Sequence, residues 1–360
     1  MDGIPVSLRR RTAAAPALIV AWAALTPVAP AAFSWAGEPP ASRSATAPAP
    51  GGVPLAEVAA RDARWLEAAR RASESLVWTD EEVRHDWRLQ RRPGSDACRI
   101  LDPADAVVKA GNTAECRAAF ARIAATESLP AVRDETVILL HGLGEGRDSM
   151  LPLAAHLRRS LDATVLLYGY ASVKADIDAH GQALARMVGA LPRSTRLNFV
   201  GHSLGNLVIR RWMSVADPAD LARARRVVML GPPNQGSDLA RMAARIWGVA
   251  ARAEGAARDL LVEWPAVTEK LAVPPCPFGI VAGGTGTEQG FSPLLDGDDD
   301  AVVRVAETRL EGADDFLVVP VHHAAMMRHA DVQRATESFL KTGRFGRPGA
   351  ADDAGPAAAP

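Results

Sequence analysis

The residue best suited to covalent chemistry is Ser203, at the centre of the segment Gly-His-Ser-Leu-Gly that spans residues 201–205. An apolar, β-like run at 196–200 precedes this segment, and a helix-like run follows it. A strand, a tight turn with a serine and a helix together form a nucleophile elbow, which holds the serine exposed above the edge of a sheet. The amino end of the following helix would direct its dipole at the same point, which favours the anionic intermediate of acyl transfer.

A second glycine-rich loop, at residues 141–146, follows an apolar run at 136–140. Such a loop lets backbone amides approach a substrate oxygen closely. We therefore expect the amides of Leu143 and Leu204 to form an oxyanion hole, with one donor from each loop. His141 precedes the serine in the chain, which favours a structural role over that of a base.

Acidic residues follow the serine, as the order serine, acid, histidine requires. Four aspartates compete for the role of the acid: Asp296, Asp298, Asp299 and Asp300. We favour Asp300, because burial of the apolar residues 301–303 directly after it would hold its carboxylate inward. Asp299 is the second choice. A run of acids is otherwise typical of a solvated loop or a cation site.

Two adjacent histidines, His322 and His323, follow a buried-type apolar run at 316–319. One of them is the expected general base, which takes the proton of Ser203 while the acid fixes its tautomer. We favour His323, with His322 as its neighbour. No cysteine or histidine cluster in the sequence has the spacing of a metal site, so we expect no metal.

Short apolar runs alternate with helix-like segments from residue 136 onward. The strand-like runs are 136–140, 163–168, 196–200, 226–230, 277–282 and 316–319, and the helix-like segments are 150–159, 176–190, 204–216 and 331–341. This alternation predicts an α/β fold with a mostly parallel sheet flanked by helices, in a catalytic domain at 131–342. Because Ser203, Asp300 and His323 each follow a predicted strand, they should meet at the carboxyl ends of the strands.

Residues 231–275 suspend this alternation after the fourth recognised strand and predict a helical insertion. The segment contains apolar residues such as Leu239, Met242 and Trp264. Helices here would either cover the site as a cap or lid, or simply pack on the sheet, and the pattern fits both arrangements about equally well.

The terminal segments differ from the catalytic domain in composition. Residues 1–36 have a basic start, an alanine-rich apolar stretch and a small-residue site, and they resemble a secretory signal peptide. This predicts a secreted or periplasmic protein, or a membrane-anchored one if the segment stays uncleaved. Residues 37–54 predict a flexible linker, and apolar residues at helical spacing predict a helical N-terminal extension at 55–130. We expect a disordered tail at 343–360.

Charge and cysteine content restrict the partners and the compartment. The formal net charge of −1 at pH 7 argues against binding to nucleic acid or another polyanion. In an oxidising compartment, Cys98 and Cys116 would form a disulfide. The third cysteine, Cys276, precedes a predicted strand, which indicates a small buried apolar residue rather than a nucleophile.

Taken together, the motifs resemble those of the α/β-hydrolase superfamily, and within it the bacterial lipase-like serine hydrolases, over residues 134–341. The segments that carry the resemblance are 137–144, 199–205, 228–237, 300–303 and 321–323. The site residues that the resemblance implies are the same as those above: Ser203 as nucleophile, Asp300 as acid, His323 as base, and the amides of Leu143 and Leu204 as the oxyanion hole. It also implies hydrolysis of carboxylic esters, acylglycerols among them, without a cofactor.

Three positions depart from the usual pattern of this superfamily. Asn206 stands where a second glycine is usual, and Ala301 replaces the glycine that often follows the acid. His322 lies beside His323, so there are two candidates for the general base. The first departure would tighten the start of the helix after the elbow.

The leading hypothesis is a serine hydrolase that cleaves a small-molecule or lipid ester through an acyl-Ser203 intermediate, with contact to a membrane surface left open. An acyltransferase or thioesterase would use the same three residues, because water and another acceptor reach the same acyl-enzyme. A hydrolase fold without activity, used for binding at the cell envelope, is the third hypothesis. The sequence predicts neither the acyl chain length nor the oligomeric state.

Overall fold

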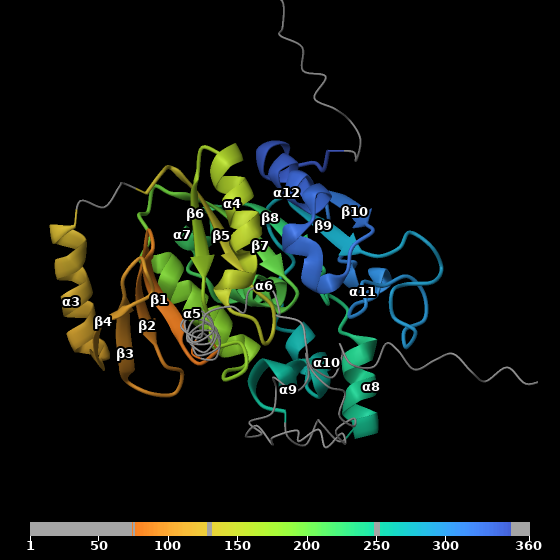
Figure 1. Cartoon of the computed structure of the whole chain (residues 1–360), viewed down its shortest axis with the longest axis horizontal. Helices are drawn as coiled ribbons and strands as arrows, with labels where there is room; N and C mark the ends of the chain where they lie inside the picture. Colours follow the sequence, from red (N-terminus) through yellow and green to blue (C-terminus); the bar gives the residue numbers. More distant parts are fainter. Residues whose placement is uncertain (1–73, 75, 128–131, 248–252, 347–360) are drawn as a thin grey trace, which may run out of the picture. The chain divides into compact units, whose positions relative to one another are not determined.

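The central sheet consists of six parallel strands in the spatial order β10-β9-β8-β7-β5-β6 (Figure 1). The computed structural model describes residues 74, 76–127, 132–247 and 253–346. The strands of this sheet are β5 (Glu135–Leu140), β6 (Thr164–Tyr168), β7 (Arg196–His202), β8 (Ala224–Leu230), β9 (Phe278–Gly283) and β10 (Asp315–Val319). The predicted strands and their parallel arrangement are therefore confirmed.

The register of the strands brings their carboxyl ends to one edge of the sheet. Leu140 of β5 pairs with Gly201 of β7, and His202 of β7 pairs with Leu230 of β8. The loops that follow these strands therefore start side by side, at the edge where open parallel sheets bind their ligands.

Helices cover both faces of the sheet, which explains why its strands are apolar along most of their length. The helices of one face are α5 (Ile177–Gly189) and α6 (Leu204–Val215), and those of the other are α4 (Leu151–Ser160) and α12 (Ala330–Thr342). Within β5, Ile138 and Leu140 belong to the core on the α5–α6 face, whereas Val137 and Leu139 belong to the core on the other. Burial of each such side chain stabilises the fold by about 1.5–3 kcal/mol.

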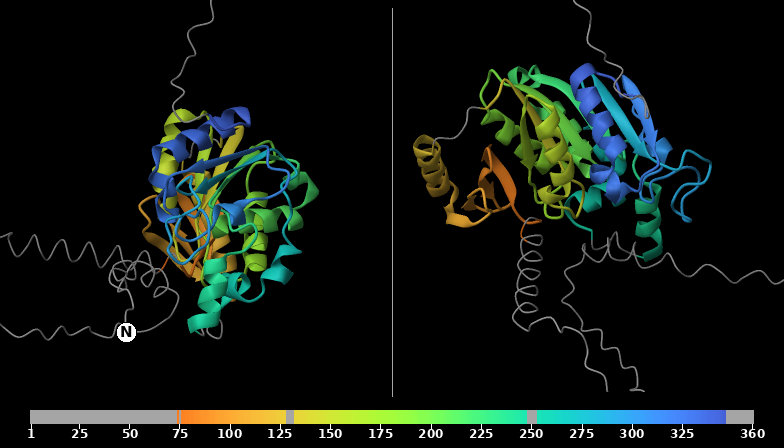
Figure 2. Two further views of the ribbon diagram at one scale, coloured as in Figure 1. Left: turned by 90° about the vertical axis from the view of Figure 1, so that its right-hand side faces the viewer. Right: turned by 45° about the horizontal axis from the view of Figure 1, so that its top comes forward.

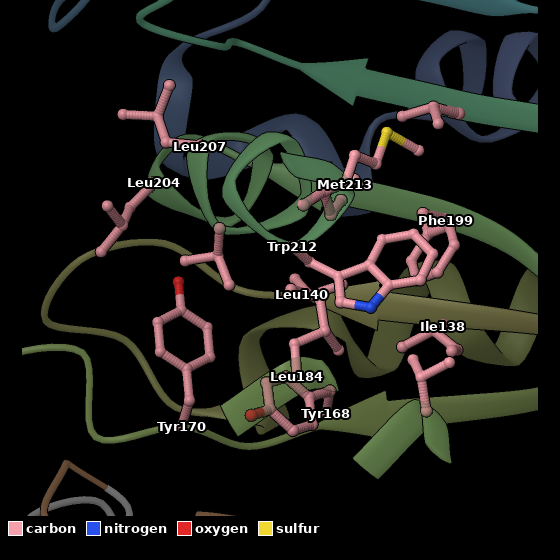
Figure 3. Packing of buried hydrophobic residues seen from close by; sticks show 14 of the residues in the cluster. Ile138, Leu140, Tyr168, Tyr170, Leu184, Phe199, Leu204, Leu207, Trp212 and Met213 are labelled. Atoms are coloured by element: carbon pink, nitrogen blue, oxygen red, sulfur yellow. The ribbon is translucent and has the colours of Figure 1, made fainter. Parts of the chain in front are cut away.

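Helix α6, which starts directly after Ser203, is anchored by a fully buried face. Leu204, Leu207 and Trp212 are each 0% exposed. All three belong to the same core, and Figure 3 shows Trp212 beside Phe199 of β7, where the ring centroids lie 4.6 Å apart. Tight packing of α6 in this core therefore fixes the position of the elbow.

The helical insertion predicted at 231–275 is present. It contains α8 (Asp238–Trp247), α9 (Gly255–Leu261) and α10 (Trp264–Thr268), while residues 248–252 lie outside the described part of the chain. Shorter helical segments elsewhere are η1 (Arg147–Met150), α7 (Pro218–Leu221), α11 (Val305–Thr308) and η3 (His323–Arg328). Whether the insertion moves as a lid stays a prediction.

The predicted helical extension at 55–130 is wrong over residues 79–112, which form an antiparallel four-stranded sheet. Its strands are β1 (Thr79–Arg84), β2 (Trp87–Arg91), β3 (Ala97–Leu101) and β4 (Val107–Asn112), in that spatial order, and α3 (Thr113–Thr126) follows. Within the described part of this extension, α3 is helical as predicted. Figure 2 shows this sheet beside α5 and the β6 edge, at the opposite end of the central sheet from β10.

The physical reason for this error is that charged side chains of these strands are buried as ion pairs. The Asp80 carboxylate is fully buried and accepts hydrogen bonds from Arg88 at 2.5 Å, from Gln90 at 2.8 Å and from the Gly169 amide at 2.8 Å. Arg88 also donates to the Leu167 carbonyl. Sequence patterns assign such charged residues to solvent, so the strands could not be recognised from hydrophobic alternation.

Cys98 of β3 and Cys116 of α3 lie in a small separate core with Leu89, Ile100 and Phe120. Both are free thiols in the structure, and they belong to the same buried cluster. Burial, together with the neighbouring Cys116, raises the pKa of the Cys98 thiol to about 12. The predicted disulfide is therefore not formed in this structure and stays a prediction for an oxidising environment.

Several predicted segments lie outside the described residues: the signal peptide at 1–36, the linker at 37–54 and most of the tail at 343–360. Within the described ranges, none of the helices combines the length and the apolar character needed to cross a lipid bilayer. Cys276 is partly buried against the main core, and burial raises the pKa of its thiol to about 11, which fits a packing role.

Candidate active site

Ser203 occupies the turn between β7 and α6 in a strained backbone conformation. Its φ is 51° and its ψ is −119°, a combination that residues with a side chain rarely adopt. Strain of this kind costs roughly 1–3 kcal/mol and persists only where the surrounding structure enforces it. The sharp turn predicted for the elbow is therefore present.

The two glycines of the elbow are required by close packing. A Cβ on Gly201 would lie 2.4 Å from Asn206 Oδ1, and a Cβ on Gly205 would lie 2.6 Å from the Leu140 carbonyl oxygen. Both distances are shorter than any van der Waals contact. The turn can therefore form only with glycine at both positions.

Asn206, one of the departures from the superfamily pattern, holds the elbow in place. Its side chain is fully buried, and Nδ2 donates to the Ser203 carbonyl at 3.1 Å and to the Leu230 carbonyl at 3.2 Å. The Ser203 amide donates to the same Leu230 carbonyl at 2.9 Å. The asparagine thus links the strained serine to the end of β8, a role that sequence reasoning did not assign.

The structure brings Asp300 and His323 together. His323 Nδ1 donates to Asp300 Oδ2 at 2.6 Å, because an ionised carboxylate can only accept. Asp300 is fully buried, and its Oδ1 accepts from the amides of Val302 and Val303. Burial alone would lower the pKa of His323, but the charge of Asp300 and the hydrogen bond to it raise that pKa above its ordinary value.

The second choices for acid and base lie apart from this pair. Asp299 accepts from the amides of Ser292 and Ala301, and no hydrogen bond joins it to a histidine within the described residues. His322 is exposed and packs against Phe291, with ring centroids 3.9 Å apart and ring planes tilted by 38°. Ala301 has a φ of 82°, which explains why glycine is frequent at this position.

Ser203 and His323 flank the end of β8. The Leu230 carbonyl accepts from the Ser203 amide, and a Cβ on the next residue, Gly231, would lie 3.0 Å from His323 Nδ1. His323 Nε2 makes no hydrogen bond with any described residue. The imidazole is therefore held through Nδ1, with its second nitrogen available to a proton donor.

Among the described residues, nothing accepts a hydrogen bond from the amides of Leu143 and Leu204. Gly142 donates its amide to Glu145 Oε2 at 2.9 Å, and Gly144 donates its amide to Ser172 Oγ at 3.2 Å. Between them, the Leu143 amide has no acceptor in the described part of the chain, and neither does the Leu204 amide, the first of α6. Two hydrogen-bond donors are thus available beside the serine, one on each of two loops.

His141 lies in the interior rather than at the reacting centre. It is fully buried, its ring stacks on Tyr170 with centroids 4.2 Å apart, and the Tyr170 hydroxyl donates to its carbonyl at 2.6 Å. Burial lowers the pKa of His141 to about 4. These contacts fit the structural role expected from the sequence.

The helical insertion begins beside the loop that carries Asp300. Ser237 donates its hydroxyl to the Val302 carbonyl, and the Asp238 amide donates to Glu307 Oε1. A cavity of about 470 Å³ lies between α8 and this loop, lined by Asp238, Arg241, Met242, Leu294, Leu295, Asp296 and Arg304. The start of the insertion therefore contacts the loop that carries the acid.

The chain matches no protein-family model and no curated protein sequence. Solved structures with a similar fold include the mature lipase BlEst2 of Bacillus licheniformis, which is 17% identical with a TM-score of 0.47 and is matched over 61% of this chain and 95% of its own. The phospholipase PlaB of Legionella pneumophila is 19% identical, with a TM-score of 0.44, over 56% of each chain. A metagenomic carboxyl esterase is 17% identical, with a TM-score of 0.39, over 56% of this chain and 69% of its own. Similarity at this level carries no conclusion about activity.

Proposed function

The chain has an α/β-hydrolase fold, and from that premise we propose that it is a serine hydrolase that cleaves carboxylic esters through an acyl-Ser203 intermediate. The observation that carries the proposal is the 2.6 Å hydrogen bond between His323 and Asp300 beside a serine on a strained elbow. A serine hydroxyl is a weak nucleophile, and it becomes effective when an oriented base removes its proton.

In the acylation step, Ser203 Oγ attacks the ester carbonyl carbon while His323 Nε2 takes the hydroxyl proton. Asp300 stabilises the resulting imidazolium and keeps Nδ1 protonated, so that Nε2 is the nitrogen that reacts. The electron pair of the carbonyl bond moves to the oxygen, which accepts hydrogen bonds from the amides of Leu143 and Leu204.

The tetrahedral intermediate then expels the alcohol, which takes its proton from His323 Nε2 as the bond from the carbonyl carbon to the alkoxy oxygen breaks. In the second half of the reaction, water attacks the acyl-Ser203 carbonyl and gives one proton to His323 Nε2. Collapse of that intermediate returns the proton to Ser203 Oγ and releases the carboxylic acid. The residues end in their starting state, and the reaction consumes one water for each ester.

The proposal is tested by hydrolysis of p-nitrophenyl esters of increasing acyl length with purified wild-type protein and Ser203→Ala. We expect release of p-nitrophenol by the wild type and a loss of about 10⁴-fold or more in the variant. Ser214→Ala, at the exposed end of α6, is the matched control and should keep wild-type activity. Equal activity of Ser203→Ala and the wild type would overturn the proposal.

The same experiment addresses the substrate class and the acceptor. A preference for long acyl chains, with activity that rises at a lipid interface, indicates a lipase, and a preference for short soluble esters indicates an esterase. Product analysis with and without an added alcohol separates transfer to water from transfer to another acceptor, since both pass through the same acyl-enzyme.

A further inference from the structure

His202, the residue directly before the serine, has both of its ring nitrogens next to oxygen atoms. Nδ1 lies 3.2 Å from Glu145 Oε2, and Nε2 lies 3.1 Å from the carbonyl oxygen of His323. The His202 side chain is 1% exposed, so water cannot replace these contacts. A neutral imidazole donates from one nitrogen only, whereas a carbonyl oxygen accepts and cannot donate.

The Glu145 carboxylate is an acceptor as well. Its Oε2 atom already accepts from the Gly142 amide at 2.9 Å and from the Ser149 hydroxyl at 3.0 Å. Burial alone would raise the pKa of Glu145, but the charge of His202 and the hydrogen bonds from His202 and Gly142 lower it well below its ordinary range. With acceptors on both sides, the His202 ring satisfies both contacts only when both nitrogens carry a proton.

We propose that His202 is a protonated positioning residue, which pairs with Glu145 and binds the three loops of the catalytic site to one another. These loops are the turn that carries Leu143, the elbow that carries Ser203, and the start of η3 that carries His323. The inference rests on the proposed function, since it assigns a task to a residue of the same site. His202 itself touches neither the substrate nor the transferred proton.

The packing of Gly142 shows how closely the first two loops meet. A Cβ on this glycine would lie 3.2 Å from Glu145 Oε2, 3.2 Å from His202 Nδ1 and 3.3 Å from Ser203 Cβ. The backbone of Gly142 thus lies directly on the elbow, and its neighbour Leu143 supplies the unused amide. A shift in the Glu145–His202 contact would move that amide relative to Ser203.

Several titratable groups face His202. Glu145 faces Nδ1 from the loop after β5, while His141, from the same loop, is kept neutral by burial that lowers its pKa to about 4. On the other side lie the ring of His323, 4.6 Å away between centroids, and Asp300 beyond it. A His202 ring with a single proton would leave one of its two contacts without a hydrogen and release one loop.

The first experiment measures kcat and KM against pH for Glu145→Gln, His202→Gln and the double variant. We expect kcat to fall about 10- to 100-fold in each single variant, because the Leu143 amide would shift slightly relative to Ser203. The change in KM should be smaller. The double variant should be no slower than the slower single variant, since both changes break one unit. In Glu145→Gln the alkaline limb should move to lower pH, which a purely structural role would not cause.

The matched control is Glu337→Gln, which removes the carboxylate of a second histidine–glutamate pair. His156 Nε2 lies 2.7 Å from Glu337 Oε2, between α4 and α12. This variant should keep both the wild-type kcat and the wild-type alkaline limb. Wild-type kcat and pH profile in both Glu145→Gln and His202→Gln would overturn the inference.

A second measurement observes the protonation of His202 directly in the wild-type protein. In the full chain labelled with ¹⁵N-histidine, the ring nitrogens of His202 should both give the signals of protonated nitrogens at neutral pH, assigned by their absence in His202→Gln. The signals of a neutral imidazole would overturn the inference. If Ser203→Ala abolishes hydrolysis while these tests fail, the hydrolase proposal stands and the role of His202 falls; if Ser203→Ala is fully active, the hydrolase proposal itself is wrong.

Discussion

Two histidine–carboxylate pairs lie next to each other in this molecule, and they differ in the second nitrogen of the ring. His323 donates from Nδ1 to Asp300, and its Nε2 has no partner among the described residues. His202 faces Glu145 with Nδ1 and the His323 carbonyl with Nε2. The first ring has a nitrogen with which to exchange a proton, whereas both nitrogens of the second are occupied.

The comparison teaches that a carboxylate beside a histidine does not by itself identify a base. Both histidines contact a carboxylate, but only a ring nitrogen without a partner allows the proton to move. Loss of the Asp300–His323 pair should therefore abolish activity. Loss of the Glu145–His202 pair should only reduce activity, because the catalytic groups remain but are less well positioned.

The largest effect should follow from His323→Ala. We expect kcat to fall about 10⁴-fold, because the base is removed while the donors of the oxyanion hole stay in place. His202→Gln should lose at most about 10²-fold under the same conditions. Steady-state kinetics with one p-nitrophenyl ester checks both variants, and equal losses would abolish the distinction between the two pairs.

Histidines without a carboxylate partner extend the comparison. Burial lowers the pKa of His141 to about 4 and that of His180 to about 3. In the folded state both pKa values lie below the unfolded value of about 6.5. The contribution of these two histidines to the stability of the fold is therefore fully present above that pH and is lost as the pH falls towards 4. We expect the free energy of unfolding to decrease by several kcal/mol over this range.

Urea unfolding between pH 7 and pH 4 measures this loss. His180→Leu removes one of the two groups, so its stability should depend less on pH than that of the wild type. An identical pH dependence in the two proteins would show that the His180 ring is not held neutral by the fold.

A smaller effect should follow from Asn206→Ala. The Asn206 side chain supports the serine through hydrogen bonds and carries no charge. The variant leaves the carbonyls of Ser203 and Leu230 without the donor that the buried amide supplies. We expect a loss of about 1–3 kcal/mol in unfolding free energy, measured by urea titration at neutral pH. Unchanged stability would mean that the strained elbow does not depend on this side chain.

The most subtle prediction concerns the acid limb of the pH profile. The pKa of His323 is raised by Asp300, and a protonated His323 cannot accept the serine proton. Activity should therefore fall with decreasing pH through a value above 6.5, the ordinary pKa of histidine. In Asp300→Asn the limb should move to lower pH, measured as kcat/KM; an unmoved limb would assign it to another group.

The sequence sufficed for the parts of the fold in which strands are buried on both faces. Runs such as 136–140 and 196–200 are apolar because helices cover them on both faces of the sheet. Both runs are strands in the structure, as predicted. The preference for Asp300 over Asp299 came from a local argument about the residues behind it. Val303, one of those residues, is 1% exposed and donates its amide to Asp300.

The parts that could not be predicted depend on contacts between distant residues. The β1–β4 sheet is hidden because Asp80 and Arg88 are buried as a pair, which no local pattern reveals. The contact between Glu145 and His202 joins residues 57 positions apart. A glutamate in a glycine-rich loop and a histidine in an elbow give no signal of each other until the loops are placed in space.

The most direct test of the central claim is peptide mapping by mass spectrometry after reaction with a fluorophosphonate. Such a reagent bonds covalently to a serine only when a base and oxyanion donors activate it. The account predicts a single modified peptide, the one containing Ser203, and no adduct in His323→Ala over the same time. Modification of a different serine, or equal labelling of the folded wild type and His323→Ala, would contradict it.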